Sequence, residues 1–125
     1  MDTIQVCVRI RPLSKREIDA GHSCYWTRID NTILNNQGNQ FNFDAVYDHQ
    51  NDSTIYNTVK SLIDSVMNGF NATIIAYGQT SSGKTHTMIG TNTNNGIIPN
   101  AINDIFLNIN NVRFNTKQSR WIVSI

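Results

Sequence analysis

Cysteine is scarce in this sequence, whose 125 residues contain only Cys7 and Cys24. Two thiols without a framework spacing exclude a disulfide-stapled module and favour a reducing compartment, with both thiols free. An apolar run long enough to cross a membrane is also missing, and no signal peptide precedes the first predicted strand. We therefore expect a soluble intracellular domain.

Charged residues are few as well. Asp, Glu, Lys and Arg make up 15% of the chain, and the formal net charge is +1, so the sequence has no strong electrostatic attraction to nucleic acid or to an anionic membrane. His22, His49 and His86 lack the spacing of metal ligands, so we predict neither a metal-binding cluster of side chains nor a nucleophile triad. The hydrophobic share of 39% is typical of a globular chain, and this length fits one small domain.

The chain opens with an alternating pattern. Apolar residues alternate with polar ones over residues 4–10, which predicts a strand with Arg9 and Arg11 on one face. Pro12 cannot donate a hydrogen bond to a ladder, so the strand is expected to end there.

A short helical turn and further strands are predicted next. Ser14 and Glu17 have the spacing of a capping box, and Gly21 can close the turn. Short strands separated by polar turns are expected at residues 25–30, 32–34 and 40–46.

An amphipathic helix follows. Asp52 or Ser53 can cap its start, and Gly69 can end it. Apolar residues fall on one face of this helix at a spacing of 3.6 residues. They are Ile55, Tyr56, Val59, Leu62, Ile63, Val66 and Met67.

The second half contains a short apolar run and a long helix. Residues 73–77 are predicted to form a strand buried on both faces, with Tyr77 in the core. After a helix that opens at Lys84, residues 91–96 form a polar loop, and Pro99 suits the first turn of a further helix. Its expected apolar stripe is Ile98, Ala101, Ile102, Ile105, Phe106 and Ile109. Residues 121–125 are predicted to be another strand, inside which the chain ends.

One motif carries chemistry. Gly78-Gln79-Thr80-Ser81-Ser82-Gly83-Lys84-Thr85 matches G-x-x-x-x-G-K-[ST] at every fixed position. Glycines let the backbone curl so that N–H groups point at phosphates, and the following helix N-terminus adds partial positive charge. Lys84 is expected to reach the β- and γ-phosphates, and the Thr85 hydroxyl to coordinate Mg²⁺. The motif leaves an apolar run and opens a helix, which favours a nucleotide site over the alternative of a flexible polar turn.

The residues around this loop extend the match. Residues 71–90 closely resemble the kinesin signature N-G-T-I-F-A-Y-G-Q-T-x-S-G-K-T-x-T-M-x-G, with Ala72 and Ile75 as departures. Further blocks agree in order: V-R-I-R-P-L at residues 8–13, F-N-F-D-A-V-Y at 41–47, and G-I-I-P-N-A-I-N-D-I-F at 96–106, where Asn100 replaces the usual Arg. On these blocks the chain is identified as a member of the kinesin motor family, and its opening blocks look most similar to the centromere-associated branch.

The resemblance implies an α/β fold of the P-loop NTPase class, with a kinesin-motor-like central mixed sheet flanked by helices. Residues 1–125 would be the N-terminal portion of that domain, truncated after roughly its first third. In the family, the strand corresponding to residues 73–77 is central, and its neighbours come from later sequence. Here it would lack them.

The resemblance also implies roles for individual residues. The loop from Gly78 to Thr85 would hold the phosphates of ATP or ADP together with Mg²⁺. Arg9, Arg11 and Pro12 would flank the adenine from the first strand, with His86 on its other side. From the residues alone, the two arginines also fit a solvated strand face and His86 an ordinary helix-surface position.

Two elements of kinesin motors are missing from these 125 residues: the S-S-R-S-H switch and the D-x-x-G switch. The family is a microtubule-stimulated ATPase, but we name no catalytic residue and expect binding without movement from this chain alone. The implied partners are microtubules or tubulin, without nucleic acid or membrane, and the implied location is the cytoplasm and its cytoskeleton.

Three hypotheses therefore stay open. The first is a truncated kinesin that is inactive alone. The second is a free-standing nucleotide-binding module that folds by itself and is not a motor. The third is a non-enzymatic interaction protein that pairs with tubulin or with the missing half of a motor.

Overall fold

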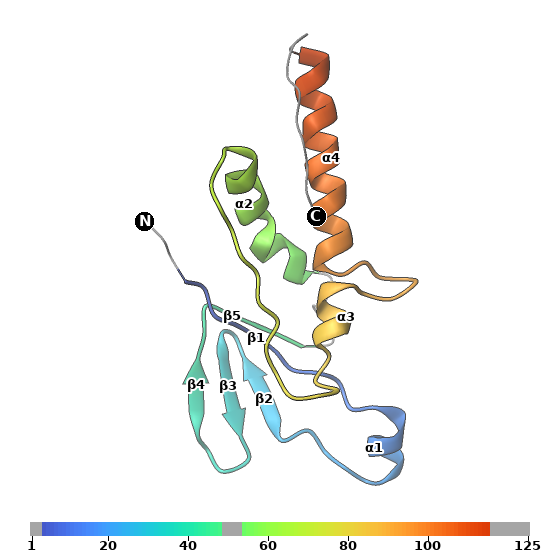
Figure 1. Ribbon diagram of the computed structural model, residues 1–125. Coiled ribbons are helices and arrows are strands. Elements are labelled where there is room, and N and C mark those ends of the chain that lie inside the picture. The colour runs from blue at the N-terminus through green and yellow to red at the C-terminus, as the bar shows by residue number, and fades with distance from the viewer. Residues whose placement is uncertain (1–3, 49–53, 116–125) are drawn as a thin grey trace. The chain divides into compact units, whose positions relative to one another are not determined.

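The computed structural model describes residues 4–48 and 54–115, and side chains up to residue 110. The chain divides into two compact units, Met1–Ser53 and Thr54–Ile125. Figure 1 shows strands in the first unit and helices in the second. Among the described helices, none has the length and apolar character that a membrane span requires.

The first unit holds a three-stranded antiparallel sheet. Its strands are β2 (Trp26–Ile29), β3 (Thr32–Asn35) and β4 (Gln40–Asn42), in the order β2-β3-β4. The turn between β3 and β4 contains Gly38 at φ +84°, and the side chain of Asn35 accepts hydrogen bonds from the amides at 37 and 39. This turn fixes the register, because Leu34 then pairs with Gln40. The strands predicted at 25–30 and 32–34 are confirmed.

A parallel pair of strands completes this unit: β1 (Cys7–Arg9) and β5 (Ala45–Tyr47). The single strand predicted over residues 40–46 is therefore wrong, because it is divided into β4 and β5. The backbone changes partners between them: the Phe43 amide donates to Asn31, and the Asp44 amide donates to Val6. Val46 and Tyr47 of β5 are buried with Ile33 of β3, and they form the core of the unit.

The predicted helical turn is confirmed as α1 (Lys15–Asp19), with its capping box. The Ser14 hydroxyl accepts from the Glu17 amide at 3.4 Å, and the Glu17 carboxylate accepts from the Ser14 amide at 2.6 Å. Gly21 follows the helix at φ +78°, a left-handed conformation that favours glycine.

In the second unit, α2 (Ile55–Met67) is the predicted amphipathic helix, and it ends as predicted at Gly69. Gly69 has φ +89°, and the amides of Gly69 and Phe70 donate to the carbonyls of Val66 and Ser65. This is the Schellman arrangement of a helix C-terminus. Thr54 precedes the helix, while the proposed caps Asp52 and Ser53 lie outside the described residues.

Two further helices follow, α3 (Lys84–Met88) and α4 (Ile97–Asn115). Helix α4 contacts α2, and their buried residues are Ile63 of α2 and Ile97 and Ile109 of α4. Ile98 and Phe106, which the predicted stripe assigned to the buried face, are exposed. The stripe is thus only partly correct, and the polar loop predicted between α3 and α4 is confirmed.

The strand predicted at residues 73–77 does not form among the described residues. The segment is not paired in any sheet, Ile75 is 80% exposed and Tyr77 is 97% exposed, so the core position predicted for Tyr77 is also wrong. The physical reason is that a strand needs a hydrogen-bonded neighbour, and no described strand of its unit supplies one. The strand predicted at 121–125 lies outside the described residues.

Candidate functional site

The loop that matches the phosphate-binding motif has an unusual backbone. Gly78 has φ +152°, Ser81 +65° and Gly83 +97°, so three positions adopt positive φ within six residues of chain. Gly83 lies immediately before α3, and the Ser82 amide donates to the Gln79 carbonyl at 3.2 Å, which closes a turn. A non-glycine residue rarely has positive φ, and strain of this kind often accompanies a ligand-binding loop.

Gly78 and Ser82 approach each other closely across the loop. A Cβ atom built on Gly78 would lie 2.5 Å from the Ser82 hydroxyl oxygen and 3.2 Å from the Ser82 Cβ. The position therefore requires glycine both for its space and for its backbone conformation. This close approach keeps the loop tightly curled.

The Lys84 ammonium binds back onto the loop. Its Nζ atom donates to the carbonyl of Gly78 at 2.8 Å and to that of Gln79 at 2.7 Å. An ammonium has three N–H donors, so one remains for an acceptor outside the loop, such as a phosphate oxygen. The same two bonds place the positive charge beside the curled backbone.

Helix α3 begins at this loop. Its first regular backbone bond runs from the Thr87 amide to the Gly83 carbonyl at 2.9 Å, so the amides of residues 84–86 have no carbonyl one turn earlier. Thr85 and His86 are exposed, and the Thr85 hydroxyl makes no hydrogen bond to the rest of the described chain. These features fit a phosphate group with Mg²⁺: spare amides, a spare ammonium donor and an accessible hydroxyl ligand.

The other predicted nucleotide-binding residues lie in the first unit. Arg9 is half-buried and pairs with Tyr47 in the parallel ladder, while Pro12 is exposed. Arg11 donates through Nη2 to the Glu17 carboxylate at 2.7 Å and through Nη1 to the Pro12 carbonyl at 3.0 Å. Arg11 is therefore held by an ion pair instead of extending into solvent from a strand face.

Glu17 connects Arg11 to the capping box of α1, a role that the sequence analysis missed. One carboxylate oxygen accepts from Arg11, and the other accepts from the Ser14 amide. The capping-box spacing was visible in the sequence. The ion pair was not, because it depends on how the chain turns at Pro12.

We predict that Glu17 titrates far below an ordinary glutamate. The hydrogen bond from Arg11, and then the one from the Ser14 amide, lower the pKa of Glu17 from 4.5 to about 2. Because this pKa is lowered, the stabilisation is present above pH 4.5 and is lost as the pH falls toward 2. Carboxyl chemical shifts followed by NMR should give the low midpoint. Arg11→Ala should raise it, and Arg16→Ala, on the same helix, should leave it unchanged. An ordinary midpoint in the unaltered chain would contradict the ion pair.

The model of the kinesin motor domain family matches residues 9–125. The chain belongs to the kinesin motor domain family. The resemblance predicted from the sequence motifs is thereby confirmed. A solved structure of a fast kinesin also matches, with a TM-score of 0.77 and 34% sequence identity. That match covers 84% of this chain and 32% of the other, and it supports the kinesin-like α/β fold.

Individual kinesin relatives agree with this assignment. Centromere-associated protein E of Homo sapiens is 46% identical over 112 residues, which are 85% of this chain and 4% of the relative. Kinesin heavy chain of Drosophila melanogaster is 41% identical over 133 residues, which are 96% of this chain and 14% of the relative. The chain thus spans a small part of the length of the kinesins that it matches.

One further feature of the kinesin signature is explained by the structure. Gly90 and Gly96 lie back to back where the polar loop closes: they flank an isolated bridge, and the Gly96 amide donates to Ile89 at 3.0 Å. A Cβ atom on Gly96 would lie 2.6 Å from backbone atoms of Met88, Ile89 and Gly90. The spacing of two glycines around a polar loop was the available signal for this contact, and the sequence analysis did not use it.

Proposed function

We propose that this chain binds Mg·ATP or Mg·ADP through residues 78–85, as the N-terminal portion of a kinesin-type microtubule motor ATPase. The observation that carries the proposal is the geometry of Lys84, whose ammonium lies against the first two carbonyls of the loop and keeps a donor to spare. Membership of the kinesin family supports it from an independent side.

The roles of the residues follow from their chemistry. Amides of the loop, contributed by Gly78, Gln79, Thr80, Ser81, Ser82 and Gly83, would surround the phosphates. Lys84 would neutralise charge on the β- and γ-phosphates, and Thr85 would be the protein ligand of Mg²⁺. The metal, when bound, bridges phosphate oxygens and offsets their charge, and it ordinarily keeps several waters.

We propose that the base is bound by residues implied through the family resemblance. Arg9, Arg11 and Pro12 would contact one side of the adenine and His86 the other. A guanidinium plane stacks well on an aromatic ring, which suits both arginines. The ion pair with Glu17 supports a fixed orientation of Arg11, because it removes rotamers that the side chain would otherwise sample.

Binding, and not hydrolysis or movement, is what we propose for this chain by itself. Phosphoryl transfer depends on positioning water and charge around the γ-phosphate. The S-S-R-S-H and D-x-x-G patterns that serve this purpose in kinesins do not occur in the 125 residues. Interaction with microtubules, and a place on the cytoskeleton, would then belong to a motor that includes those elements.

A second candidate is an interaction protein without nucleotide chemistry, or an inactive remnant of a motor. The exposed apolar side chains of Ile75 and Tyr77 favour this candidate, since a surface of that kind suits a protein partner. Such a protein would bind tubulin, or the missing half of a motor, equally well after Lys84→Ala. A loss of that binding in the variant would argue for the nucleotide-dependent alternative.

The deciding experiment is a titration of the purified chain with a fluorescent ADP analogue and Mg²⁺. We expect saturable binding, and a loss of affinity of about 10- to 100-fold on Lys84→Ala, because a charge-assisted hydrogen bond contributes roughly 1.5–3 kcal/mol. Removing Mg²⁺ with a chelator should also weaken binding. Lys15→Ala, which removes an exposed lysine from α1, is the matched control.

Binding with equal affinity by the parent chain and Lys84→Ala would contradict the proposed site. An absence of binding by a chain with the expected helical circular dichroism would contradict the proposed function itself. That result would leave the interaction protein or the remnant.

A further inference from the structure

Residues 71–77 form an extended segment that connects α2 to the phosphate-binding loop (Figure 1). Within its unit, no backbone N–H or C=O of this segment is hydrogen-bonded to another described backbone group. Both edges of the segment are therefore open. Unpaired backbone groups in a β-prone segment are a template for pairing with another strand.

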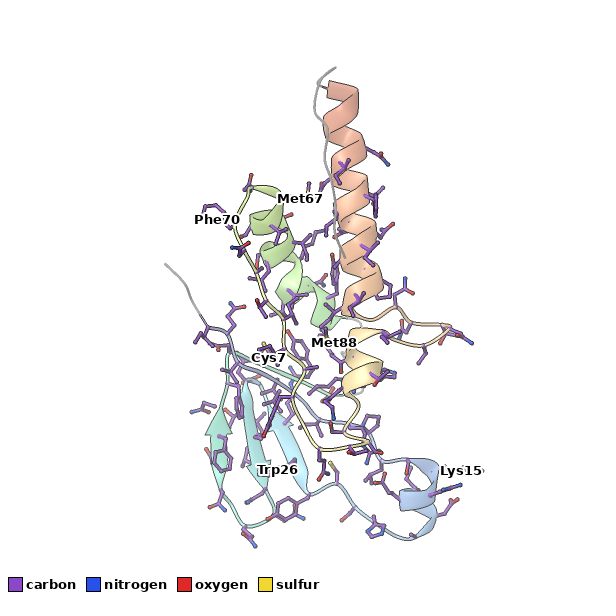
Figure 2. All side chains as sticks on the ribbon, in the orientation of Figure 1. Cys7, Lys15, Trp26, Met67, Phe70 and Met88 are labelled. Carbon is purple, nitrogen blue, oxygen red and sulfur yellow. The ribbon has the colours of Figure 1, made fainter. Side chains whose placement is uncertain are left out.

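The segment already has the side-chain alternation of a strand. Thr73, Ile75 and Tyr77 are exposed, while Ile74 and Ala76 between them are half-buried. Phe70, at the end of α2, is also 68% exposed, and Figure 2 shows its side chain directed away from that helix. One face of the segment is thus covered, and its other face presents apolar side chains to solvent.

The sequence of the segment limits what can pair with it. No charged residue and no proline occurs between Phe70 and Gly83, and the residues at 73–77 are β-branched, aromatic or small. Short uncharged stretches of high β-propensity without proline are the type that pairs with copies of itself. A charged peptide would gain no complementary charge here, whereas an identical strand meets no like-charge repulsion.

We propose that residues 71–77 pair with the same segment of a second copy of this chain, as antiparallel strands centred on Ile75. In that register Ile75 faces Ile75, and Thr73 faces Tyr77, all on the exposed face. Contacts between β-branched and aromatic residues across strands are among the favourable pairs in sheets. The arrangement is self-complementary, as a two-fold interface requires. The second edge of each strand remains open for further copies.

The first test measures the mass of the 125-residue chain in solution by light scattering over a range of concentrations. We expect a mass at least twice 14.1 kDa. Ile75→Lys should return the chain to a monomer, because it places like charges directly opposite each other. Ile29→Lys is the matched control: Ile29 is 55% exposed and lies in β2, an edge strand of the other unit. A mixture of Ile75→Lys with Ile75→Glu should restore association.

The second test fixes the register by cross-linking. In a chain that carries Cys7→Ser and Cys24→Ser, Ile75→Cys should form an intermolecular disulfide, because facing Cα atoms in an antiparallel pair lie within reach of one. Ile74→Cys should not, since residue 74 would face residue 76. A monomeric parent chain would overturn the proposal. So would association that Ile75→Lys leaves intact, or association that Ile29→Lys abolishes.

Discussion

Replacing Gly96 with alanine is expected to destabilise the second unit and to weaken nucleotide binding. The added Cβ would lie 2.6 Å from backbone atoms of Met88, Ile89 and Gly90, and none of these atoms can rotate away as a side chain could. Overpacking of this kind costs about 1–3 kcal/mol, and occasionally more. The free energy of unfolding, measured with urea, should fall by that amount.

The effect on binding follows from the length of α3. Gly96 contacts the C-terminal end of this helix, and Lys84 and Thr85 are at its other end, only five residues away. A rigid helix so short transmits a displacement from one end to the other, so the proposed ligands of phosphate and Mg²⁺ would move.

Gly69→Ala is the matched control for this variant. Gly69 also has a positive φ, +89°, but a Cβ atom there would meet nothing within 4 Å. The control should therefore lose stability through backbone strain, by about 1–2 kcal/mol, while its affinity for the ADP analogue stays that of the parent chain. If Gly96→Ala kept both the parent stability and the parent affinity, the contact between the two glycines would not position α3.

Replacing Asp104 with alanine is expected to loosen the packing of α2 on α4. The Asp104 carboxylate accepts a hydrogen bond from the Tyr56 hydroxyl at 2.8 Å and lies 3.8 Å from the Lys60 ammonium. Burial, and then the hydrogen bond to Asp104, raise the pKa of the Tyr56 phenol, so the phenol remains a donor well above neutral pH. Removing the carboxylate leaves that hydroxyl partly buried without its acceptor, at a cost of about 1.5–3 kcal/mol.

Two comparison variants separate the contributions to this contact. Tyr56→Phe should lose much of the same stability, and in a double-mutant cycle with Asp104→Ala the two losses should not add. Lys60→Ala should cost less than about 0.5 kcal/mol, because its ammonium is largely exposed and the ion pair is long. Equal losses for Lys60→Ala and Tyr56→Phe would contradict the assignment of the main contact to Tyr56. Urea unfolding measures all of these variants.

Local sequence patterns predicted the elements that depend on local interactions. The capping box of α1, the Schellman end of α2 at Gly69 and the opening of α3 at Lys84 each involve residues within one or two turns of each other. The loop motif likewise predicted which residues curl together, since its positive φ angles are imposed within the loop itself. Such elements are predictable because their partners are neighbours in the chain.

Long-range partners were the source of the errors. The alternation over residues 40–46 gave no indication that Phe43 and Asp44 change partners, because period two describes a face and not a neighbour. Residues 73–77 have strand composition, yet pairing decides whether a strand forms, and no described strand of their unit pairs with them. The stripe of α4 was partly wrong for a similar reason: only the side that contacts α2 is buried.

The sequence by itself determined the family, the phosphate-binding loop and the helix ends, because each is a pattern of adjacent residues with its own chemistry. Tertiary structure alone decided that Arg11 is held by Glu17, that Gly96 abuts α3 and that Asp104 accepts from Tyr56. Each of these contacts joins residues whose distance is set by a turn or by packing between helices. A linear pattern does not encode such a distance, whereas the folded backbone fixes it.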